Sequence, residues 1–541
     1  MLLSAGLLLA SPALAANYQV SNTNDSGAGS LREAINQANA NAGPDTITFA
    51  SSVTGTINLT SSSLYIQDSV QIQGPGASVL TVDGSNIVVA PPAQDNGTQG
   101  QSSAASIFQI APQSQAKILS RISGLTTGGP PPAIDVSISG LTMTGGNAKY
   151  GGAIAAAVTN LAVNNCVITG NTATAAGGGI FSFTKYGSLN VSDSVISNNQ
   201  VTGSTGSSGP FMTGGGGIST FLQDTTINRS TISGNTAPAG GGILLQSYYA
   251  TTATAQGATG GTPPPSATVL ISNSTLSGNT AYGLGGGYLT TLHDAMTGGG
   301  PYLSGIGGGA LSLASNIQIV NTTVTGNSAT DLGGGLALGS ANGSSAMVGN
   351  STIVGNSATN YGGGLVVNAY YAAAPTVANT VIGGNSAPSQ PDVSTSGSPG
   401  ADPGIDLAYS LVQTPGTAVL NDNGGNLFNQ APLLGGLGNN GGPTLTLLPQ
   451  AGSPLINAGD PGFSGLAFDQ RGPGYDRVVN GRVDIGATEF GAGSTTPGGG
   501  YGYTPVPGLG DAGKFGLGAL LGLVGLAVAR RRRHPASRQR G

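Results

Sequence analysis

The middle of the chain repeats a short alternation of apolar and polar positions that ends in asparagine. The unit reads Cys166–Asn171 in an early copy and Ser351–Asn356 in a late one. Such alternation predicts a β-strand in which every second side chain lies on the same face. Three residues before the closing asparagine stands an apolar column: Ile168, Ile196, Ile232, Leu276, Val324, Ile353 and Ile382. Five residues before it stands a column of small residues on the same face: Cys166, Ser194, Ser230, Ser274, Thr322, Ser351 and Thr380.

The spacing of the closing asparagines gives the length of one repeat. They are Asn171, Asn199, Asn235, Asn279, Asn327, Asn356 and Asn385, at intervals of 28, 36, 44, 48, 29 and 29 residues. A coil of about 28 residues therefore carries insertions in three places. Each coil also has a glycine run before an aliphatic residue, as in Gly177–Ile180 and Gly362–Leu365. Glycine allows the positive φ angles of close turns, so these runs predict a second corner.

Asparagine also dominates the position six residues before the closing one. Asparagine tolerates left-handed corners, and amides stacked at a strand spacing of about 4.8 Å can bond along a ladder. We therefore predict corners at both asparagine columns and a structural ladder at Asn165, Asn273, Asn321, Asn350 and Asn379. Asp193 and Arg229 replace asparagine on consecutive coils, which predicts an ion pair between them.

These patterns predict an all-β fold, a single-stranded right-handed parallel β-helix whose core is the apolar column. Leucine-rich repeats fit less well, because their shorter period and helical segment are missing. Upstream, Ser30 precedes Glu33 by three residues, a capping-box pattern, and Leu31, Ala34, Ile35 and Ala38 form one apolar helix face. We expect this helix to plug the N-terminal end of the solenoid.

The amino-acid composition limits the functions open to the chain. The 541 residues include 95 glycines, 16 basic and 21 acidic residues, and one cysteine. Cys166 has no partner for a disulfide within the chain, and its place in the small column predicts a buried filler, not a nucleophile. Six of the 16 basic residues lie between 530 and 540, which leaves ten basic against 21 acidic residues elsewhere. An acidic body lacks the Lys/Arg footprint of nucleic-acid binding.

The two ends read as targeting segments. Residues 1–16 are apolar and end in Ala13-Leu14-Ala15, the pattern of a secretory signal peptide. Residues 491–510 form a Gly/Pro/Thr-rich linker, and residues 511–541 hold an apolar helix, Phe515–Ala529, followed by arginines. Between the ends we expect an N-terminal cap with the first coils (17–133), β-helix repeats with loops (134–430) and a C-terminal closing module (431–490).

Several motifs resemble those of bacterial surface proteins. Residues 134–390 resemble the polymorphic outer-membrane-protein repeat, with Gly151–Ile154 as its Gly-Gly-Ala-Ile signature and Ile in the usual Phe place of Ile232–Asn235. Asn24–Ile35 resembles the CSLREA-type N-terminus, with Gly29 where cysteine would stand. Both resemblances imply an exported parallel β-helix.

The C-terminal part carries two further resemblances. Residues 439–490 resemble the module of choice-of-anchor Q proteins, through Asn440–Thr446, Ser453–Gly459, Asp469–Gly472 and Asp484–Ala487. Val506–Gly513 with the following apolar helix and arginines is similar to an IPTL-CTERM sorting signal. This resemblance implies envelope sorting machinery as a partner, a transient or retained membrane anchor, and removal of the tail.

One dense charged cluster stands out in the body: Asp469, Arg471, Arg477, Arg482 and Asp484. We interpret it as an ion-pair network that closes the C-terminal end. Cation binding at Asp460, Asp469 and Asp484 is the alternative, because hard cations need several oxygen ligands, but no EF-hand spacing supports it. We expect no metal and no cofactor.

Catalysis is the less favoured interpretation. Glycosidic cleavage needs a close carboxylate pair, whereas the repeats hold only scattered carboxylates: Asp135, Asp193, Asp224, Asp294 and Asp331. Their basic residues, Lys149, Lys185 and Arg229, are equally scattered.

Binding is better supported, at an edge that follows the glycine-run strands. We place there Lys185, Tyr186, Tyr248, Tyr249, His293, Tyr370 and Tyr371, with two of the long insertions. Tyrosines on loops of varied length are typical of a glycan or protein contact surface, although they could simply cover their own loops. We expect a monomeric, exported adhesin or surface structural protein at the cell surface or outer envelope. The alternative is a polysaccharide lyase or hydrolase on the same scaffold.

Overall fold

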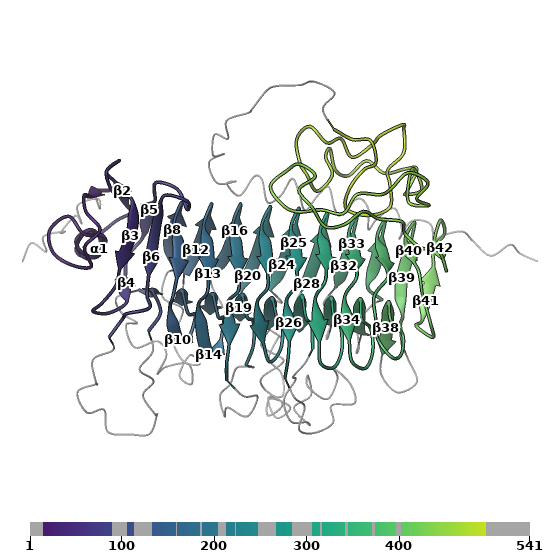
Figure 1. Cartoon of the computed structure of the whole chain (residues 1–541), viewed down its shortest axis with the longest axis horizontal. Coiled ribbons are helices and arrows are strands. Elements are labelled where there is room, and N and C mark those ends of the chain that lie inside the picture. Colours follow the sequence, from purple (N-terminus) through teal and green to yellow (C-terminus); the bar gives the residue numbers. More distant parts are fainter. Residues whose placement is uncertain are drawn as a thin grey trace, which may run out of the picture.

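The computed structural model describes residues 15–88, 105–112, 133–157, 159–183, 187–203, 213–221, 223–246, 267–283, 306–313, 316–340, 345–369, 374–396 and 402–493. In this part of the chain, parallel β-strands stack into an elongated solenoid (Figure 1). The signal peptide and the sorting tail predicted at 1–16 and 511–541 lie outside it, apart from Ala15 and Ala16. None of the helices described is long and apolar enough to cross a membrane.

Two of the four sheets run the length of the solenoid. Sheet A contains β1 (Asn17–Val20), β2 (Asp45–Phe49), β5 (Val70–Gln73), β8 (Ile134–Ser139), β12 (Thr159–Asn164), β16 (Ser188–Ser192), β20 (Asp224–Asn228), β24 (Thr268–Ser272), β28 (Asn316–Val320), β32 (Ala346–Gly349), β36 (Thr376–Ala378), β39 (Ile405–Ala408) and β41 (Leu420–Asp422). Sheet B contains β3 (Gly55–Asn58), β6 (Leu80–Asp83), β9 (Thr142–Thr144), β13 (Val167–Thr169), β17 (Val195–Ser197), β21 (Thr231–Ser233), β25 (Thr275–Ser277), β29 (Thr323–Thr325), β33 (Thr352–Val354), β37 (Val381–Gly383), β40 (Leu411–Val412) and β42 (Leu427–Phe428).

The other two sheets complete the wall. Sheet C contains β4 (Leu64–Ile66), β7 (Phe108–Ile110), β11 (Ile154–Ala157), β15 (Ile180–Phe183), β19 (Ile218–Phe221), β23 (Ile243–Gln246), β27 (Ala310–Leu313), β31 (Leu336–Ser340), β35 (Leu365–Ala369) and β38 (Val393–Ser396). Sheet D contains β10 (Asn147–Tyr150), β14 (Thr172–Ala176), β18 (Gln200–Val201), β22 (Thr236–Ala237), β26 (Thr280–Ala281), β30 (Ser328–Ala329) and β34 (Ser357–Ala358).

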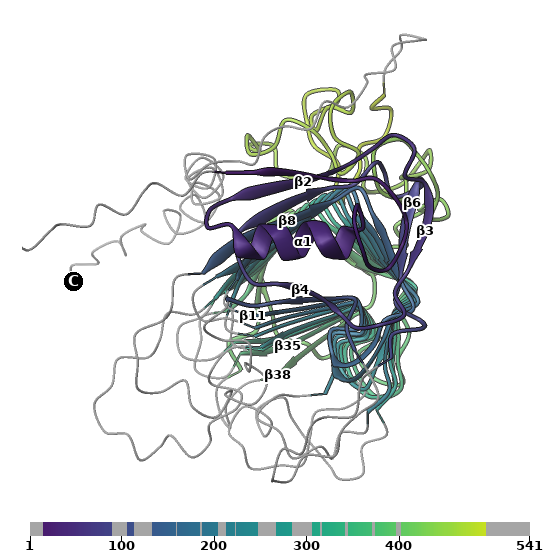
Figure 2. The same cartoon turned by 90° about the vertical axis from the view of Figure 1, so that its left-hand side faces the viewer.

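The path of one coil shows the hand of the solenoid. From β8 to β35 the chain passes through sheets A, B, D and C in turn. Figure 2 looks from the N-terminal end, and the chain runs clockwise from sheet A at the top through sheet B at the right to sheet C below. Because it recedes from the viewer as it turns, the β-helix is right-handed, as predicted.

The apolar column is the core of the solenoid, and its register is the one predicted. Ile168 pairs with Ile196, Ile196 with Ile232, and Ile232 with Leu276. The pairing holds although 28, 36 and 44 residues separate these partners, so the insertions leave the stacking unchanged. All seven members of the column are fully buried.

The column of small residues closes the wall by hydrogen bonds between coils. The Ser194 Oγ accepts a bond from the Cys166 backbone N–H at 3.1 Å, and the Ser230 Oγ accepts one from Ser194 at 3.2 Å. Cys166 is buried, as predicted, and burial raises the pKa of its thiol to about 12. A thiol in this state is a packing residue and a poor nucleophile.

The position six residues before each closing asparagine forms the left-handed corner that the sequence predicted. We call its members the outer asparagine column: Asn165, Asp193, Arg229, Asn273, Asn321, Asn350 and Asn379. Its φ angles lie between 47° and 50°, including those of Asp193 and Arg229. These two residues form the predicted ion pair between coils, with Arg229 Nε donating to Asp193 Oδ1 at 2.7 Å. At the other corner the left-handed residue is mostly the glycine before the closing asparagine, such as Gly170 and Gly234, and not the asparagine itself.

The amide ladder lies in the other column from the one predicted. The closing asparagines point inward and are buried, and each Nδ2 donates to the Oδ1 of the next coil at about 3 Å, from Asn171 to Asn385. In the outer column, Asn321 Nδ2 donates a hydrogen bond to Asn273 Oδ1 at 3.2 Å. Asn321, Asn350 and Asn379 also bond to residues 460–477. A left-handed residue at the corner turns its side chain outward, which is why the outer amides meet the C-terminal module.

The N-terminal end is plugged by one helix, α1 (Leu31–Ala40), which lies across the mouth of the solenoid (Figure 2). The Ser30 Oγ accepts a bond from the Glu33 backbone N–H at 3.2 Å, so Ser30 is the N-cap. The buried face is the predicted one: Leu31, Ala34, Ile35 and Ala38. The second half of the capping box differs, because the Ser30 N–H donates to the Gly27 carbonyl and the Glu33 carboxylate accepts from Gln37.

The C-terminal module does not close the end of the solenoid, contrary to our prediction. The solenoid strands end at Phe428, and the following residues fold back over the flank of sheet B (Figure 1). Leu447, Leu455 and Ile485 of the module pack on Val354 and Val381, which point outward from sheet B. The outward face of sheet B becomes apolar in these late coils, so burying it on the flank removes apolar surface from water.

Candidate functional site

The C-terminal module docks on the solenoid through polar groups of sheet B and the outer asparagine column. Thr275 Oγ1 donates to the Leu445 carbonyl at 2.6 Å, and Thr323 Oγ1 donates to Gln470 Oε1 at 2.6 Å. The Ala487 N–H donates to Thr352 Oγ1 at 2.9 Å. Thr275, Thr323 and Thr352 occupy the same position of sheet B on three consecutive coils. Each of them bonds to a different residue of the module.

Gln470 makes more hydrogen bonds than the other docking residues. Its Nε2 donates to the Ser274 carbonyl, Thr275 Oγ1 and Thr444 Oγ1, each at 3.0 Å, and its side chain is fully buried. Both ends of the amide are therefore satisfied, as burial requires. Sequence reasoning missed this role, because a glutamine next to two charged residues carries no signal of its own.

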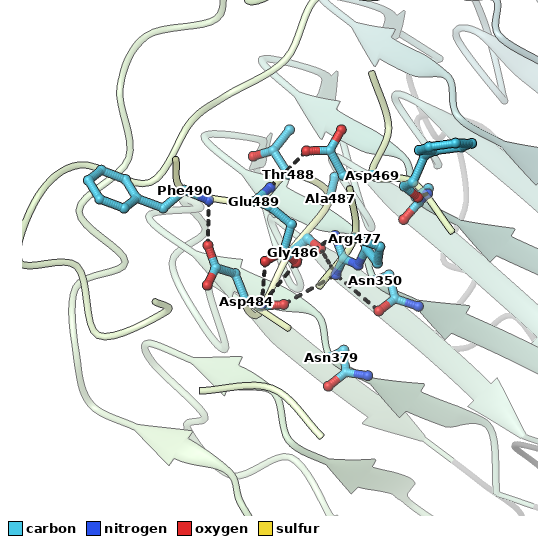
Figure 3. Close-up of polar contacts among 12 residues, drawn as sticks. Asn350, Asn379, Asp469, Arg477, Asp484, Gly486, Ala487, Thr488, Glu489 and Phe490 are labelled. Atoms are coloured by element: carbon cyan, nitrogen blue, oxygen red, sulfur yellow. Dashed lines mark hydrogen bonds and ion pairs between the residues drawn. The ribbon is translucent and has the colours of Figure 1, made fainter. Parts of the chain in front are cut away.

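The charged cluster of the module is buried against this interface (Figure 3). The Asp469 carboxylate receives a bidentate contact from Arg471, with Nη2 to Oδ2 at 2.6 Å. Arg477 is fully buried, and its Nη1 lies 3.4 Å from Glu489 Oε1. Its Nη2 crosses to the solenoid and donates to Asn350 Oδ1 at 3.0 Å. The cluster therefore ties the module to the outer asparagine column.

Backbone N–H groups satisfy most of the remaining carboxylate oxygens. Asp484 accepts bonds from Asn457 and Phe490, both at 2.6 Å, and Glu489 accepts from the Asp484 N–H at 2.9 and 3.0 Å. Burial raises the pKa of Glu489 to about 8, although the Arg477 guanidinium favours its ionised form. Burial also raises the pKa of Asp484 and lowers that of Arg477.

The structure brings together four of the five predicted cluster residues and adds Glu489. Arg482 lies aside, where its guanidinium donates to the carbonyls of Gly459 and Ala458. Asp460 is likewise separate and caps the turn at Gly462. Among the described residues, no three His, Cys, Asp or Glu side chains are grouped as metal ligands. Glu489 was missed because the sequence cannot show that the chain returns it to Arg477.

All seven residues predicted for the binding edge lie outside the described residues: Lys185, Tyr186, Tyr248, Tyr249, His293, Tyr370 and Tyr371. The described strands nevertheless show which connections contain them. In the sequence, six of the seven fall between a sheet C strand and the next sheet A strand. We call this side of the coil the C-to-A edge.

His293 follows β26 and precedes β27 in the sequence. Its place on the surface stays a prediction, like that of the other six residues.

The carboxylates of the described repeats have structural partners on separate coils. Asp135 accepts a bond from Asn160, Asp224 accepts from the Thr268 N–H, and Asp331 accepts from Asn360. Lys149 lies over the Tyr150 ring, with its Nζ 5.5 Å from the centroid.

Comparison with known proteins gives structural likeness alone. No family model and no curated protein matches the chain. Among solved structures, pectate lyase Pel9A is 15% identical with a TM-score of 0.41, covering 88% of this chain and 96% of its own. The A-module of mannuronan C-5 epimerase AlgE6 from Azotobacter vinelandii is 13% identical with a TM-score of 0.38, covering 76% and 96%. Tailspike protein 3 of bacteriophage CBA120 is 11% identical with a TM-score of 0.29, covering 75% and 58%.

Proposed function

We propose that this chain is an exported, envelope-anchored surface protein, an adhesin or structural element, that binds a glycan or protein along its C-to-A edge. One observation carries the proposal. The connections from β15 to β16, from β23 to β24 and from β35 to β36 all join sheet C to sheet A on the same side of the coil. They hold the tyrosines that the sequence placed on one edge, Tyr186, Tyr248, Tyr249, Tyr370 and Tyr371.

A stacked solenoid suits this role physically. Each coil is paired in register with the next, so connections of different length leave a rigid wall at a regular spacing. Tyrosine contributes a large apolar ring and a hydroxyl with little conformational entropy to lose, which favours contact with sugars or protein surfaces. Binding residues on loops of a rigid scaffold are the common arrangement.

Export and anchoring rest on the sequence of the two ends. Residues 1–16 have the pattern of a signal peptide, and residues 511–541 have that of a sorting tail. We expect the mature protein to lack the tail beyond about the linker. Intact-mass measurement of the exported protein tests this, and a mass that includes the arginine-rich tail would refute processing.

A glycan array with the purified protein tests the binding edge. We expect the double substitution Tyr249→Ser and Tyr370→Ser to abolish retention on glycan or cell surfaces. Tyr361→Ser is the matched control, because Tyr361 is 49% exposed but stands between sheets D and C. Unchanged retention in the folded double variant would contradict the proposal. Release of shortened or unsaturated sugars would favour the polysaccharide-active enzyme instead.

A further inference from the structure

The buried charged cluster of the C-terminal module contains more acidic than basic groups. Three carboxylates, those of Asp469, Asp484 and Glu489, face two guanidinium groups, those of Arg471 and Arg477. All five residues are at most 4% exposed. With every group ionised, the cluster would bury one uncompensated negative charge, which is costly away from water.

The described residues of the solenoid that bond to the module supply no charge to offset this excess. The residues that touch the module from sheet B and the outer column are uncharged: Thr275, Asn321, Thr323, Asn350, Thr352 and Asn379. On the module side, Arg482 donates to the carbonyls of Ala458 and Gly459, and the Tyr475 ring stacks on Arg471 with its centroid 4.2 Å from Cζ. A bound proton is the simplest way to neutralise the site.

We propose that the cluster holds one proton, on Glu489 when the module is docked, and that loss of this proton releases the module from sheet B. The C-terminal module is then a strap that opens as the pH rises. Glu489 is the member suited to hold the proton, because both its oxygens face a single backbone N–H and a guanidinium contact of 3.4 Å. Asp469, in contrast, has a bidentate arginine partner.

Opening would uncover a continuous stripe of sheet B. Thr275 and Thr323 are fully buried under the module, and Thr352 is 2% exposed. Thr231 and Val195 occupy the same position on the preceding coils, where the stripe is uncovered and Val195 is 38% exposed. The strap therefore conceals the late coils of a surface whose early coils are already accessible.

The direction of the pH effect follows from linkage. The raised pKa of Glu489 means that the docked form binds a proton that the open form releases. Docking is thus strongest at low pH and weakens as the pH rises toward about 8, and it changes little above that value. One released proton corresponds to an opening constant that rises about tenfold per pH unit within this window.

Hydrogen exchange of the full chain between pH 5 and pH 9 tests the strap. The amides of Gly486 and Ala487 report docking, because they donate to the Asn379 carbonyl and to Thr352 Oγ1. After correction for the intrinsic exchange rate, we expect their protection to fall with pH in the natural protein. In Glu489→Gln, which mimics the protonated side chain, we expect protection that does not depend on pH.

The sequence provides a matched control, because Glu33 is the other glutamate of the chain. Glu33→Gln should follow the natural pH profile. The same profile in Glu489→Gln as in the natural protein would overturn the proposal. If Glu489→Gln does not fold, the pH dependence of hydrogen exchange in the natural protein tests the proposal by itself. Protection of Gly486 and Ala487 that stays constant from pH 5 to pH 9, relative to the Ile232 amide in the solenoid core, would overturn it as well.

Discussion

Asn385 donates from Nδ2 to Asp392 Oδ1 at 2.9 Å, and this bond ends the buried amide ladder on a carboxylate. Each asparagine of the ladder donates toward the C-terminal side and accepts from the N-terminal side, so the last one needs an acceptor. Aspartate supplies it without adding a donor that would itself need a partner. Asp392 lies seven residues further along the same coil, directly before β38.

Asp392→Asn tests this termination. One oxygen of Asp392 accepts from Asn385, and the other accepts from the Thr414 N–H at 2.6 Å. An amide would place an N–H group against one of these donors, so we expect a loss of about 1–3 kcal/mol in the free energy of unfolding. Urea denaturation measures it. Asp224→Asn, at an exposed position, should remain within about 0.5 kcal/mol of the natural protein.

The position of the ladder can be tested within a single coil. Asn279→Ala removes the Oδ1 that accepts from both the backbone N–H and the Nδ2 of Asn235. The buried backbone N–H and one Nδ2 hydrogen then lack an acceptor, while Nδ2 keeps its bond to the Ile196 carbonyl. We expect a cost of about 2–5 kcal/mol, from two unsatisfied groups. Asn273→Gly, in the outer column, keeps the left-handed corner at φ 50° and should cost under about 1 kcal/mol. If thermal unfolding shows the same loss of stability for both variants, the stabilising ladder is not confined to the closing asparagines.

Arg477→Met should weaken the module more than the solenoid. The substitution removes the guanidinium that lies 3.4 Å from Glu489 Oε1 and leaves Asn350 Oδ1 without its donor. A buried polar group that loses its partner in this way costs about 1–3 kcal/mol. Limited proteolysis should then cut within residues 431–490 while the β-helix stays intact. Arg482→Met, at the partly exposed arginine, is the control. Equal resistance of both variants would show that Arg477 does not hold the module.

Cys166 should be inert in the native protein. Its thiol is 1% exposed, and burial raises its pKa to about 12. A thiol reagent at pH 8 should therefore modify it only after denaturant is added. Cys166→Ser should change stability by under about 1 kcal/mol, because serine occupies the same position on the next three coils. Rapid labelling of the folded chain would contradict the buried placement.

The periodic part of the structure was predictable from the sequence because it depends on local repetition. The apolar column at Ile168 and Ile196, the small column at Cys166 and the left-handed corner at Asn165 each repeat with the coil, so counting residues recovers their register. The Asp193–Arg229 pair followed from the same counting. The helix at Leu31–Ala40 was recognisable from its N-cap and its apolar face.

Tertiary structure alone decided which asparagine column forms the ladder and where the C-terminal module packs. The two asparagine columns look alike in sequence, and only the direction of the backbone at each corner turns one inward and the other outward. The module lacks a repeat, so its position depends on contacts such as Gln470 with Thr323, which lie 147 residues apart. The sequence by itself determined the coil and the residues that stack along it. Folding across coils joined Glu489, Arg477 and Asn350 into one buried cluster, because long-range packing leaves no periodic trace in the chain.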